Sequence, residues 1–292
     1  MLPGILKDQI QSKLSEKLGA GIIIHDTRPV SGGDINAAFR INTSKGSFFL
    51  KHNSASKYPG MFRSEARGLV LLEAAAEIDV PGVVDYGEAG EDAFLVLEFI
   101  ESAPRGNDFW ESFGRSLAKM HRHANELFGL DHDNYIGSLQ QHNSGHHRWA
   151  DFFIHERLER QLTLARNNGL ADSKMTEQFE RLYTRLPDIF PEEPASLVHG
   201  DLWSGNYMTG AKGQPVIIDP AVYYGHREMD IGMSRLFGGF DAGFYEAYYQ
   251  EYPLAAGWQE RVEICNLYPL MVHVNLFGGS YVNSVKNILR QF

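Results

Sequence analysis

One polar, glycine-containing run constrains the fold of this chain most: Leu197-Val198-His199-Gly200-Asp201-Leu202-Trp203-Ser204-Gly205-Asn206. Its two glycines permit a tight loop that turns the side chains of Asp201 and Asn206 toward one point. An apolar run, Val216 to Ile218, predicts a buried strand and ends at Asp219, thirteen residues after Asn206. A hairpin turn between the loop and this strand would bring Asp219 back beside Asn206.

These three side chains are the set that phosphoryl transfer requires. The reaction needs a carboxylate that takes the proton of the acceptor hydroxyl, and two ligands for the Mg²⁺ that bridges the nucleotide phosphates. We predict Asp201 as the base and Asn206 and Asp219 as the metal ligands. The order and spacing match those of kinase catalytic loops. A polar surface loop beside an ordinary edge strand is the structural alternative.

Two departures from the protein-kinase pattern favour a small-molecule kinase. His-Gly-Asp stands in place of His-Arg-Asp, and Asp-Pro-Ala in place of Asp-Phe-Gly. Asp230 follows Asp219 by only eleven positions, which leaves no room for a long activation segment that docks protein substrates. We expect Asp230 to cap a helix or brace the loop, and His199 to brace the loop as well.

The first hundred residues alternate helical and strand patterns. Helical spacing predicts helices over residues 6–18 and 63–76, and β-branched and aromatic runs predict strands over residues 21–30, 38–42, 47–51, 83–87 and 94–98. The loop between the first two strands contains Gly32, Gly33 and Asp34. Its small side chains would let backbone N–H groups approach nucleotide phosphates, although a plain hairpin turn explains the same residues.

The remaining nucleotide contacts are predicted from strand and helix positions. Lys51 ends an apolar run, where its amine can hold the α- and β-phosphates, and Glu65 in the next helix can pair with it. The run that ends in Glu98, Phe99 and Ile100 leads to a short hinge, and its backbone groups can bond an adenine edge. The alternatives without a ligand are a surface lysine at Lys51, a surface glutamate at Glu65 and a core strand that ends at residues 98–100.

Length and composition limit the class of protein. The 292 residues suffice for two compact lobes or one large domain, and helical patterns dominate from residue 107 onward. A net charge of -10 with no basic run argues against nucleic-acid binding. The absence of a signal peptide or an apolar span, together with the single Cys265, predicts a cytoplasmic protein that does not enter membranes. The loop with His142, His146 and His147 is expected at the surface or facing substrate, rather than on zinc.

The chain resembles the fructosamine kinases, or ketosamine 3-kinases, over nearly its whole length. The stretches that carry the resemblance are residues 31–38, the loop 197–206 with its Trp203, Asp219-Pro220-Ala221, the string Tyr223-Tyr224-Gly225-His226-Arg227-Glu228, and residues 235–240. The catalytic motif alone would indicate only the broader aminoglycoside-phosphotransferase-like group. The resemblance implies an α+β protein-kinase-like fold, with a nucleotide-binding lobe of antiparallel strands at residues 1–101 and a helical lobe at residues 102–292 that holds the catalytic loop and acceptor site.

The same resemblance implies an activity. Family members transfer the γ-phosphate of ATP to the 3-hydroxyl of a sugar–amine adduct on lysine or a related amine, and the product is unstable, so the family's work is deglycation. By position, Trp203, His226, Arg227 and Glu228 would flank the acceptor. Two other functions stay open: a kinase for an aminoglycoside-, choline- or amino-alcohol-like acceptor, and a nucleotide-binding module without turnover. The preferred ketosamine and the oligomeric state are not predicted.

Overall fold

The computed structural model describes residues 2–19, 21–30 and 35–292. The chain forms two compact units. The first contains Met1–Asn107 and Met208–Ile218, and the second contains Asp108–Tyr207 and Asp219–Phe292. The chain thus leaves the second unit after the catalytic loop, adds a hairpin to the first unit, and returns at Asp219. This hairpin consists of β10 (Tyr207–Thr209) and β11 (Pro215–Ile217), as the sequence predicts.

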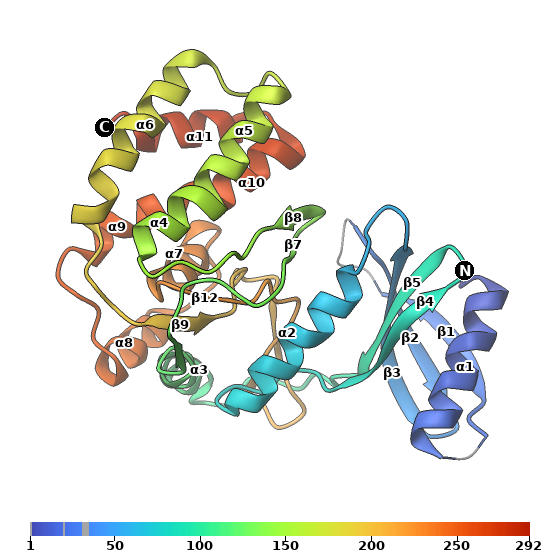
Figure 1. Ribbon diagram of the computed structural model, residues 1–292. Coiled ribbons are helices and arrows are strands. Elements are labelled where there is room, and N and C mark those ends of the chain that lie inside the picture. Colours follow the sequence, from blue (N-terminus) through green and yellow to red (C-terminus); the bar gives the residue numbers. More distant parts are fainter. Residues whose placement is uncertain (1, 20, 31–34) are drawn as a thin grey trace. The chain divides into compact units, whose positions relative to one another are not determined.

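A five-stranded antiparallel sheet in the order β1-β2-β3-β5-β4 dominates the first unit (Figure 1). Its strands are β1 (Ile24–Pro29), β2 (Ala37–Thr43), β3 (Gly46–Ser54), β4 (Val83–Ala89) and β5 (Asp92–Glu98). The five strands and the two helices predicted for this region are all present, with ends shifted by a few residues. The predicted strand over 47–51 extends three residues further in β3, because the register with β2 and β5 continues past Lys51.

The two helices of this unit cover opposite faces of the sheet. Helix α1 (Gly4–Leu18) packs its buried leucines and isoleucine against Leu50, Phe94 and Val96. Helix α2 (Met61–Ala75) packs against the alternate positions of β5, including Leu95 and Leu97. Side chains alternate between the faces of a strand, so Lys51, the neighbour of Leu50, is directed to the α2 side.

The second unit is mainly helical. Its helices are α3 (Phe109–Met120), α4 (Trp149–Phe152), the π-helical turn Phe153–Leu158, α5 (Glu159–Asn167), α6 (Ser173–Ile189), α7 (Glu228–Leu236), α8 (Ala242–Glu251), α9 (Trp258–Cys265), α10 (Leu267–Phe277) and α11 (Ser280–Leu289). A small sheet of β12 (Tyr223–Gly225), β9 (Ala195–Val198) and β6 (Ala124–Asn125), and a hairpin of β7 (Asn134–Ile136) and β8 (Leu139–Gln141), complete it.

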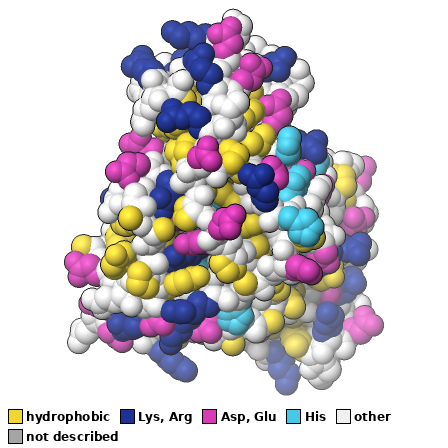
Figure 2. Space-filling model, turned by 60° about the vertical axis from the view of Figure 1, so that its left-hand side comes forward, with side chains coloured by type: hydrophobic (Ala, Val, Ile, Leu, Met, Phe, Trp, Pro, Cys, Tyr) yellow, Lys and Arg dark blue, Asp and Glu magenta, His cyan; other side chains and the backbone are white. Residues whose placement is uncertain are grey.

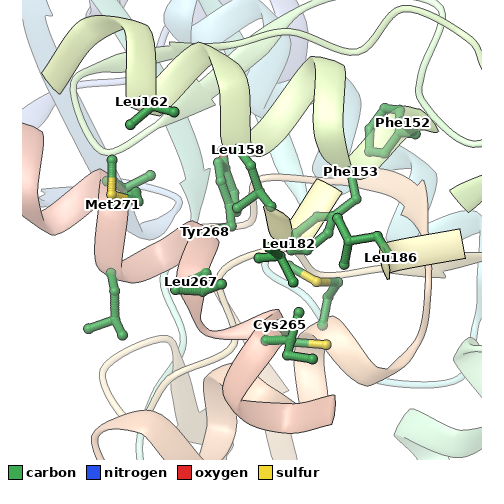
Figure 3. Close-up of a cluster of buried hydrophobic side chains, with 14 of the residues drawn as sticks. Phe152, Phe153, Leu158, Leu162, Leu182, Leu186, Cys265, Leu267, Tyr268 and Met271 are labelled. Atoms are coloured by element: carbon green, nitrogen blue, oxygen red, sulfur yellow. The ribbon is translucent and has the colours of Figure 1, made fainter. Parts of the chain in front are cut away.

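The core of the second unit gathers the apolar stripes that the sequence predicts. Phe152, Phe153, Leu158 and Leu162 point into one cluster with Leu182 and Leu186 of α6 and with Leu267 and Met271 of α10 (Figure 3). The stripe Phe109, Phe113, Leu117 and Met120 is also buried. These side chains are therefore core, and the helices that carry them form the scaffold on which the loops are mounted.

The surface carries charges of both signs. On the face shown in Figure 2, acidic and basic side chains are interspersed and several histidines lie close together. No helix among the described residues combines the length and apolar character needed to span a membrane.

Candidate active site

The candidate catalytic loop is held between two paired strands. Strand β9 leads into it and β12 follows it, and the two pair antiparallel with Tyr223 opposite Val198. The pairing continues beyond the strands, since the N–H of Ala221 donates to the carbonyl of His199 at 2.9 Å. The segment before the β10–β11 hairpin and the segment after it therefore lie next to each other.

Gly200 permits the close approach of these two segments. Its φ is 83°, in the region that favours glycine, and a Cβ at this position would lie 2.1 Å from the carbonyl oxygen of Ala221. No other residue type fits there without moving the backbone. The glycine that the sequence analysis uses as a turn residue is therefore also a packing requirement.

The three predicted catalytic groups come together at this point. Asn206 donates its Nδ2 to the carbonyl and the Oδ2 of Asp201, at 2.8 and 2.9 Å, and approaches the carbonyl of Asp219 at 3.5 Å. Because Nδ2 is engaged within the loop, the amide oxygen Oδ1 is left as the group that can ligate a cation. Asp219 has a φ of 53°, which is uncommon outside glycine and is typical of strained functional positions.

The loop is braced by two buried side chains. The carboxylate of Asp230, in the first turn of α7, accepts the N–H of His199 at 2.7 Å and the N–H of Gly200 at 2.9 Å. Nδ1 of His199 accepts the N–H of Asp201 at 3.3 Å. The bracing roles predicted for both residues are confirmed. Asp230 is not the helix cap, because Arg227 occupies that position.

Burial makes Asp201 a better base than an ordinary aspartate. It raises the pKa of the Asp201 carboxyl to about 7, the hydrogen bond from Asn206 opposes this rise, and the neighbouring carboxylates Asp219 and Asp230 add to it. A carboxylate with a pKa near neutrality is suited to accept a proton in the transition state. Asp230 behaves in the opposite way: burial alone would raise its pKa, but hydrogen bonds and nearby histidines hold it below its usual range.

The first unit contains the predicted lysine–glutamate pair. Nζ of Lys51 lies 2.6 Å from Oε1 of Glu65 on α2. Lys51 is only 5% exposed and sits within β3, so it is not the exposed strand-end lysine of the structural alternative. The ion pair fixes the direction of the lysine side chain, which is the geometry that a phosphate-binding lysine needs.

The structure describes the other residues predicted to contact the nucleotide only in part. Gly32, Gly33 and Asp34 lie outside the described residues. The N–H of Glu98, at the end of β5, already donates to the carbonyl of Gly82 at 2.8 Å. An adenine contact in this segment would therefore fall to the Glu98 carbonyl and to the backbone of Phe99 and Ile100.

The residues predicted to flank the acceptor differ in exposure. Trp203 is 38% exposed, and its ring rests on the backbone of Gly205. His226, Arg227 and Glu228 are instead fully buried and form structural contacts. Arg227 pairs with both carboxylate oxygens of Glu193, and Glu228 pairs in the same way with Arg261; these distances are 2.6–2.8 Å. Burial lowers the pKa of His226 to about 4, so its ring is neutral.

Some residues that shape the site have no local sequence signal. His121, the C-cap of α3, contacts the carboxylate of Asp230 through Nε2 at 3.1 Å and the hydroxyl of Tyr248 through Nδ1 at 2.7 Å. Arg157, in the π-helical turn, is fully buried and stacks 4.0 Å from the ring of Tyr223. The two residues of each contact lie far apart in the sequence, so no pattern among neighbouring residues indicates these contacts.

The histidine-containing loop shows no metal centre. No group of three histidine, cysteine or acidic side chains in the described part of the chain is arranged to hold a metal ion. His142 contacts Asp133 at 2.9 Å, and His146 contacts Glu156 at 3.2 Å. Cys265, the single cysteine, is buried, and burial raises the pKa of its thiol well above the usual value, so it is not a reactive thiolate.

The fold and the loop geometry fit an ATP-dependent phosphotransferase, and comparison with known proteins shows its family. The chain belongs to the fructosamine kinase family, whose model matches residues 6–292. A probable ketoamine kinase of Enterococcus faecium is 40% identical over 97% of this chain and 99% of its own length. The chloroplastic protein-ribulosamine 3-kinase of Arabidopsis thaliana is 39% identical over 90% of this chain and 81% of its own length.

Solved structures agree with this assignment. A crystal structure from Haemophilus somnus, assigned as a fructosamine-3-kinase, aligns with a TM-score of 0.88 at 30% identity, over 98% of this chain and 99% of that one. The predicted α+β, protein-kinase-like fold is thus confirmed. The membership of a kinase family also fits ATP as the phosphate donor.

Proposed function

We propose that this protein transfers the γ-phosphate of ATP to the 3-hydroxyl of ketosamines, the fructosamine or ribulosamine adducts of amines and protein lysines. The observation that carries the proposal is that Asp201 and Asn206 lie in one braced loop, with the backbone of Asp219 beside Asn206. The names of the relatives supply the acceptor class, since they include ketoamine and ribulosamine kinases. Phosphorylation at this position would make the adduct unstable and so begin deglycation.

In the proposed reaction Asp201 accepts the proton of the 3-hydroxyl. The hydroxyl oxygen forms a bond to the γ-phosphorus as the bond from that phosphorus to the β-phosphate oxygen breaks, and the products are ADP and the 3-phosphate. A pKa near 7 lets Asp201 take this proton at neutral pH. Orientation of the two substrates by a rigid loop supplies much of the rate.

The donor set fits Mg²⁺. Asn206 presents its amide oxygen and Asp219 its carboxylate, and oxygen ligands of this kind are what Mg²⁺ prefers. The ion, when bound, would neutralise charge on the phosphate oxygens. Lys51, directed by Glu65, would hold the α- and β-phosphates. We also propose that residues 1–101 bind the nucleotide and that residues 102–292 hold the catalytic loop and the acceptor site.

We propose an indirect role for the buried string at residues 226–228. Its charges are matched by Glu193 and Arg261 inside the second unit. Such a network fixes the segment between β12 and α7, and with it the position of Asp230 under the catalytic loop. Direct contact with the acceptor is then left to Trp203.

One experiment tests the function. The protein is incubated with Mg·ATP and fructosamine, ribulosamine and erythrulosamine adducts, with an aminoglycoside and choline as other acceptors, and the phosphate is located by NMR. Phosphate on the 3-oxygen of a ketosamine is the expected result. Phosphorylation of the aminoglycoside or choline alone would assign a different acceptor, and ATP binding without ADP formation for every acceptor would indicate a non-catalytic module.

A further inference from the structure

Two buried amide side chains hold the segment that follows Asp219. The carbonyl oxygen of Ala221 accepts a hydrogen bond from Nε2 of Gln141 at 3.0 Å, and that of Val222 accepts one from Nδ2 of Asn134 at 2.8 Å. Both donors belong to the β7–β8 hairpin and are buried. The two carbonyls follow the proposed metal ligand by two and three positions, so the hairpin holds the backbone that leads away from it.

The catalytic loop holds the same segment from its other side. The N–H of Ala221 donates to the carbonyl of His199 at 2.9 Å, and the carbonyl oxygen of Ala221 lies against Gly200. Ala221 is thus fixed at both its N–H and its C=O. Asp219 needs such support, because a φ of 53° is unfavourable for an aspartate and persists only where the surrounding structure imposes it.

Three further side chains anchor these two amides. Nη2 of Arg157 donates to Oδ1 of Asn143 at 2.7 Å, and Nδ2 of Asn143 donates in turn to Oδ1 of Asn134 at 2.9 Å. The hydroxyl of Tyr268 donates to Oε1 of Gln141 at 2.7 Å. Burial raises the pKa of the Tyr268 hydroxyl, so the hydroxyl keeps its proton. These five side chains, which we call the amide network, are all buried.

Only one orientation of the amides satisfies this network. A guanidinium group has donors only, and a backbone carbonyl can only accept. With Arg157 at one end and the carbonyl of Val222 at the other, each amide between them must turn its oxygen toward Arg157 and its nitrogen toward the carbonyl. A reversed amide would place two donors or two acceptors face to face, which is costly at buried positions. The network therefore presents donors in fixed directions to the segment after Asp219.

We propose that the side chains of the amide network are positioning residues, which hold the backbone after Asp219 in the geometry in which its carboxylate ligates Mg²⁺. This inference rests on the proposed function, which assigns Asp219 to the metal, and extends it to the residues that orient this ligand. Groups that support a metal ligand fix its direction, and their loss lowers the affinity for the metal. The affinity for the ion should therefore depend on the network more strongly than the affinity for the nucleotide alone.

Two variants weaken the network while they keep the volume of the side chain. Asn134→Leu removes the donor to Val222, and the amides of Gln141 and Asn143 each keep a second acceptor, the carbonyls of Ala221 and His132. Tyr268→Phe removes only the hydroxyl that holds Gln141. The probe is Mn²⁺, which takes the same oxygen ligands as Mg²⁺, and its Kd in the presence of ADP is measured by electron paramagnetic resonance.

We expect this Kd to rise about 10- to 100-fold in Asn134→Leu, the usual loss when the support of a metal ligand is removed. In Tyr268→Phe it should rise about 5-fold, the change that one ordinary hydrogen bond represents. Excess Mg²⁺ should restore most of the turnover that either variant loses at low Mg²⁺, which a general loss of folded structure would not allow.

The controls remove the same chemical groups elsewhere in the second unit. Asn275→Leu removes an amide that donates to the carbonyl of Gln161 at 2.9 Å, and Tyr183→Phe removes a hydroxyl that donates to Glu159 at 3.2 Å. Neither should change the Kd of Mn²⁺ by more than about 2-fold, because neither side chain contacts the amide network. In all four variants the Kd of ADP in EDTA should also stay within about 2-fold of the wild type.

An unchanged Kd of Mn²⁺ in Asn134→Leu and Tyr268→Phe would overturn the proposal, and Tyr268→Phe decides alone if Asn134→Leu does not fold. Equal losses of ADP affinity with and without the metal would also overturn it, because the metal site would then not be the target. Full Mn²⁺ affinity in Asp219→Asn would remove Asp219 from the metal, and the proposal with it. If the wild type binds Mn²⁺ through Asp219 but phosphorylates no ketosamine, the proposed acceptor is wrong and the role of the network stands.

Discussion

At the scale of single residues, the site depends on how protein surroundings alter ordinary side chains. Asp201 and Asp230 are both aspartates within one loop environment, yet the pKa of Asp201 is raised and that of Asp230 is lowered. The difference arises because Asp230 receives two backbone N–H groups and a histidine, whereas Asp201 receives mainly the amide of Asn206. One carboxyl is thereby suited to accept a proton and the other to remain charged.

Replacement of Asp201 tests its role as the base. In Asp201→Asn the group can no longer take a proton, and we expect kcat to fall about 10²- to 10⁴-fold, the usual size of a general-base effect. The affinity for Mg·ATP should change little, and steady-state kinetics with calorimetry measure both. Asp188→Asn, an exposed aspartate of α6, is the matched control and should retain full activity. A near-wild-type rate in Asp201→Asn would remove Asp201 from this role.

The same substitution should stabilise the metal-free protein at high pH. The pKa of Asp201 is about 7 in the folded state against an ordinary value of 3.8, so ionisation of this group opposes folding. The free energy of unfolding of the wild type should fall as pH rises from about 4 to about 7, relative to Asp201→Asn, and the gap should then stay constant. We expect a gap of about 2 kcal/mol, after allowance for the partial exposure of the side chain.

Urea denaturation in EDTA at several pH values measures this gap. A difference between the two proteins that does not depend on pH would show that the pKa of Asp201 is not raised in the folded state.

At the scale of elements, paired strands position the catalytic loop more tightly than its sequence suggests. The pairing of β9 with β12, extended by the bond from Ala221 to His199, brings the segments before and after the hairpin together. The sequence predicts the tight loop, the hairpin and the returning strand, because these depend on neighbouring residues. It does not predict that Gly200 faces a carbonyl of the opposite segment, because that contact belongs to the pairing.

Substitution of Gly200 tests this close approach. In Gly200→Ala, the new methyl group meets the carbonyl of Ala221 and the positive φ adds strain, so we expect a loss of about 3 kcal/mol or more in unfolding free energy. We also expect at least a 10-fold fall in kcat, because Asp201 is the next residue. Gly169→Ala is the control: its φ is also positive at 70°, but nothing lies within 4 Å of its Cβ position.

Gly169→Ala should cost only about 1 kcal/mol and leave kcat unchanged. Equal effects of the two substitutions would mean that the backbone angle alone matters at Gly200, and that the contact with Ala221 does not.

At the scale of the whole molecule, the chain passes between its two units on either side of the hairpin at residues 208–218. The apolar clusters on both faces of the sheet and the helical core of the second unit follow from the periodic patterns in the sequence. The burial of residues 226–228 does not follow from the sequence, because the pattern of charged residues there resembles a polar surface turn. Its partners, Glu193 and Arg261, lie 34 and 33 positions away.

Ligand linkage tests the nucleotide assignment in the intact protein. A ligand that binds only the folded state stabilises it, by about 2.7 kcal/mol at 100 times its Kd. We expect Mg·ATP to raise the Tm of the wild type, and Lys51→Met to lose most of this rise because the phosphate contact is absent. Lys57→Met, an exposed lysine of the same unit, should keep it. An undiminished rise in Lys51→Met would exclude Lys51 as a phosphate-binding residue.

The sequence by itself determined the spacing of Asp201, Asn206 and Asp219, the succession of helices and strands, and which apolar stripes enter the core. Each of these depends on residues close together in the chain. Only the tertiary structure decided that Asp230 braces the loop and does not cap α7, that His121 contacts Asp230, and that residues 226–228 are buried. The physical reason is that these contacts join distant positions, and they exist only once packing has closed the chain between them.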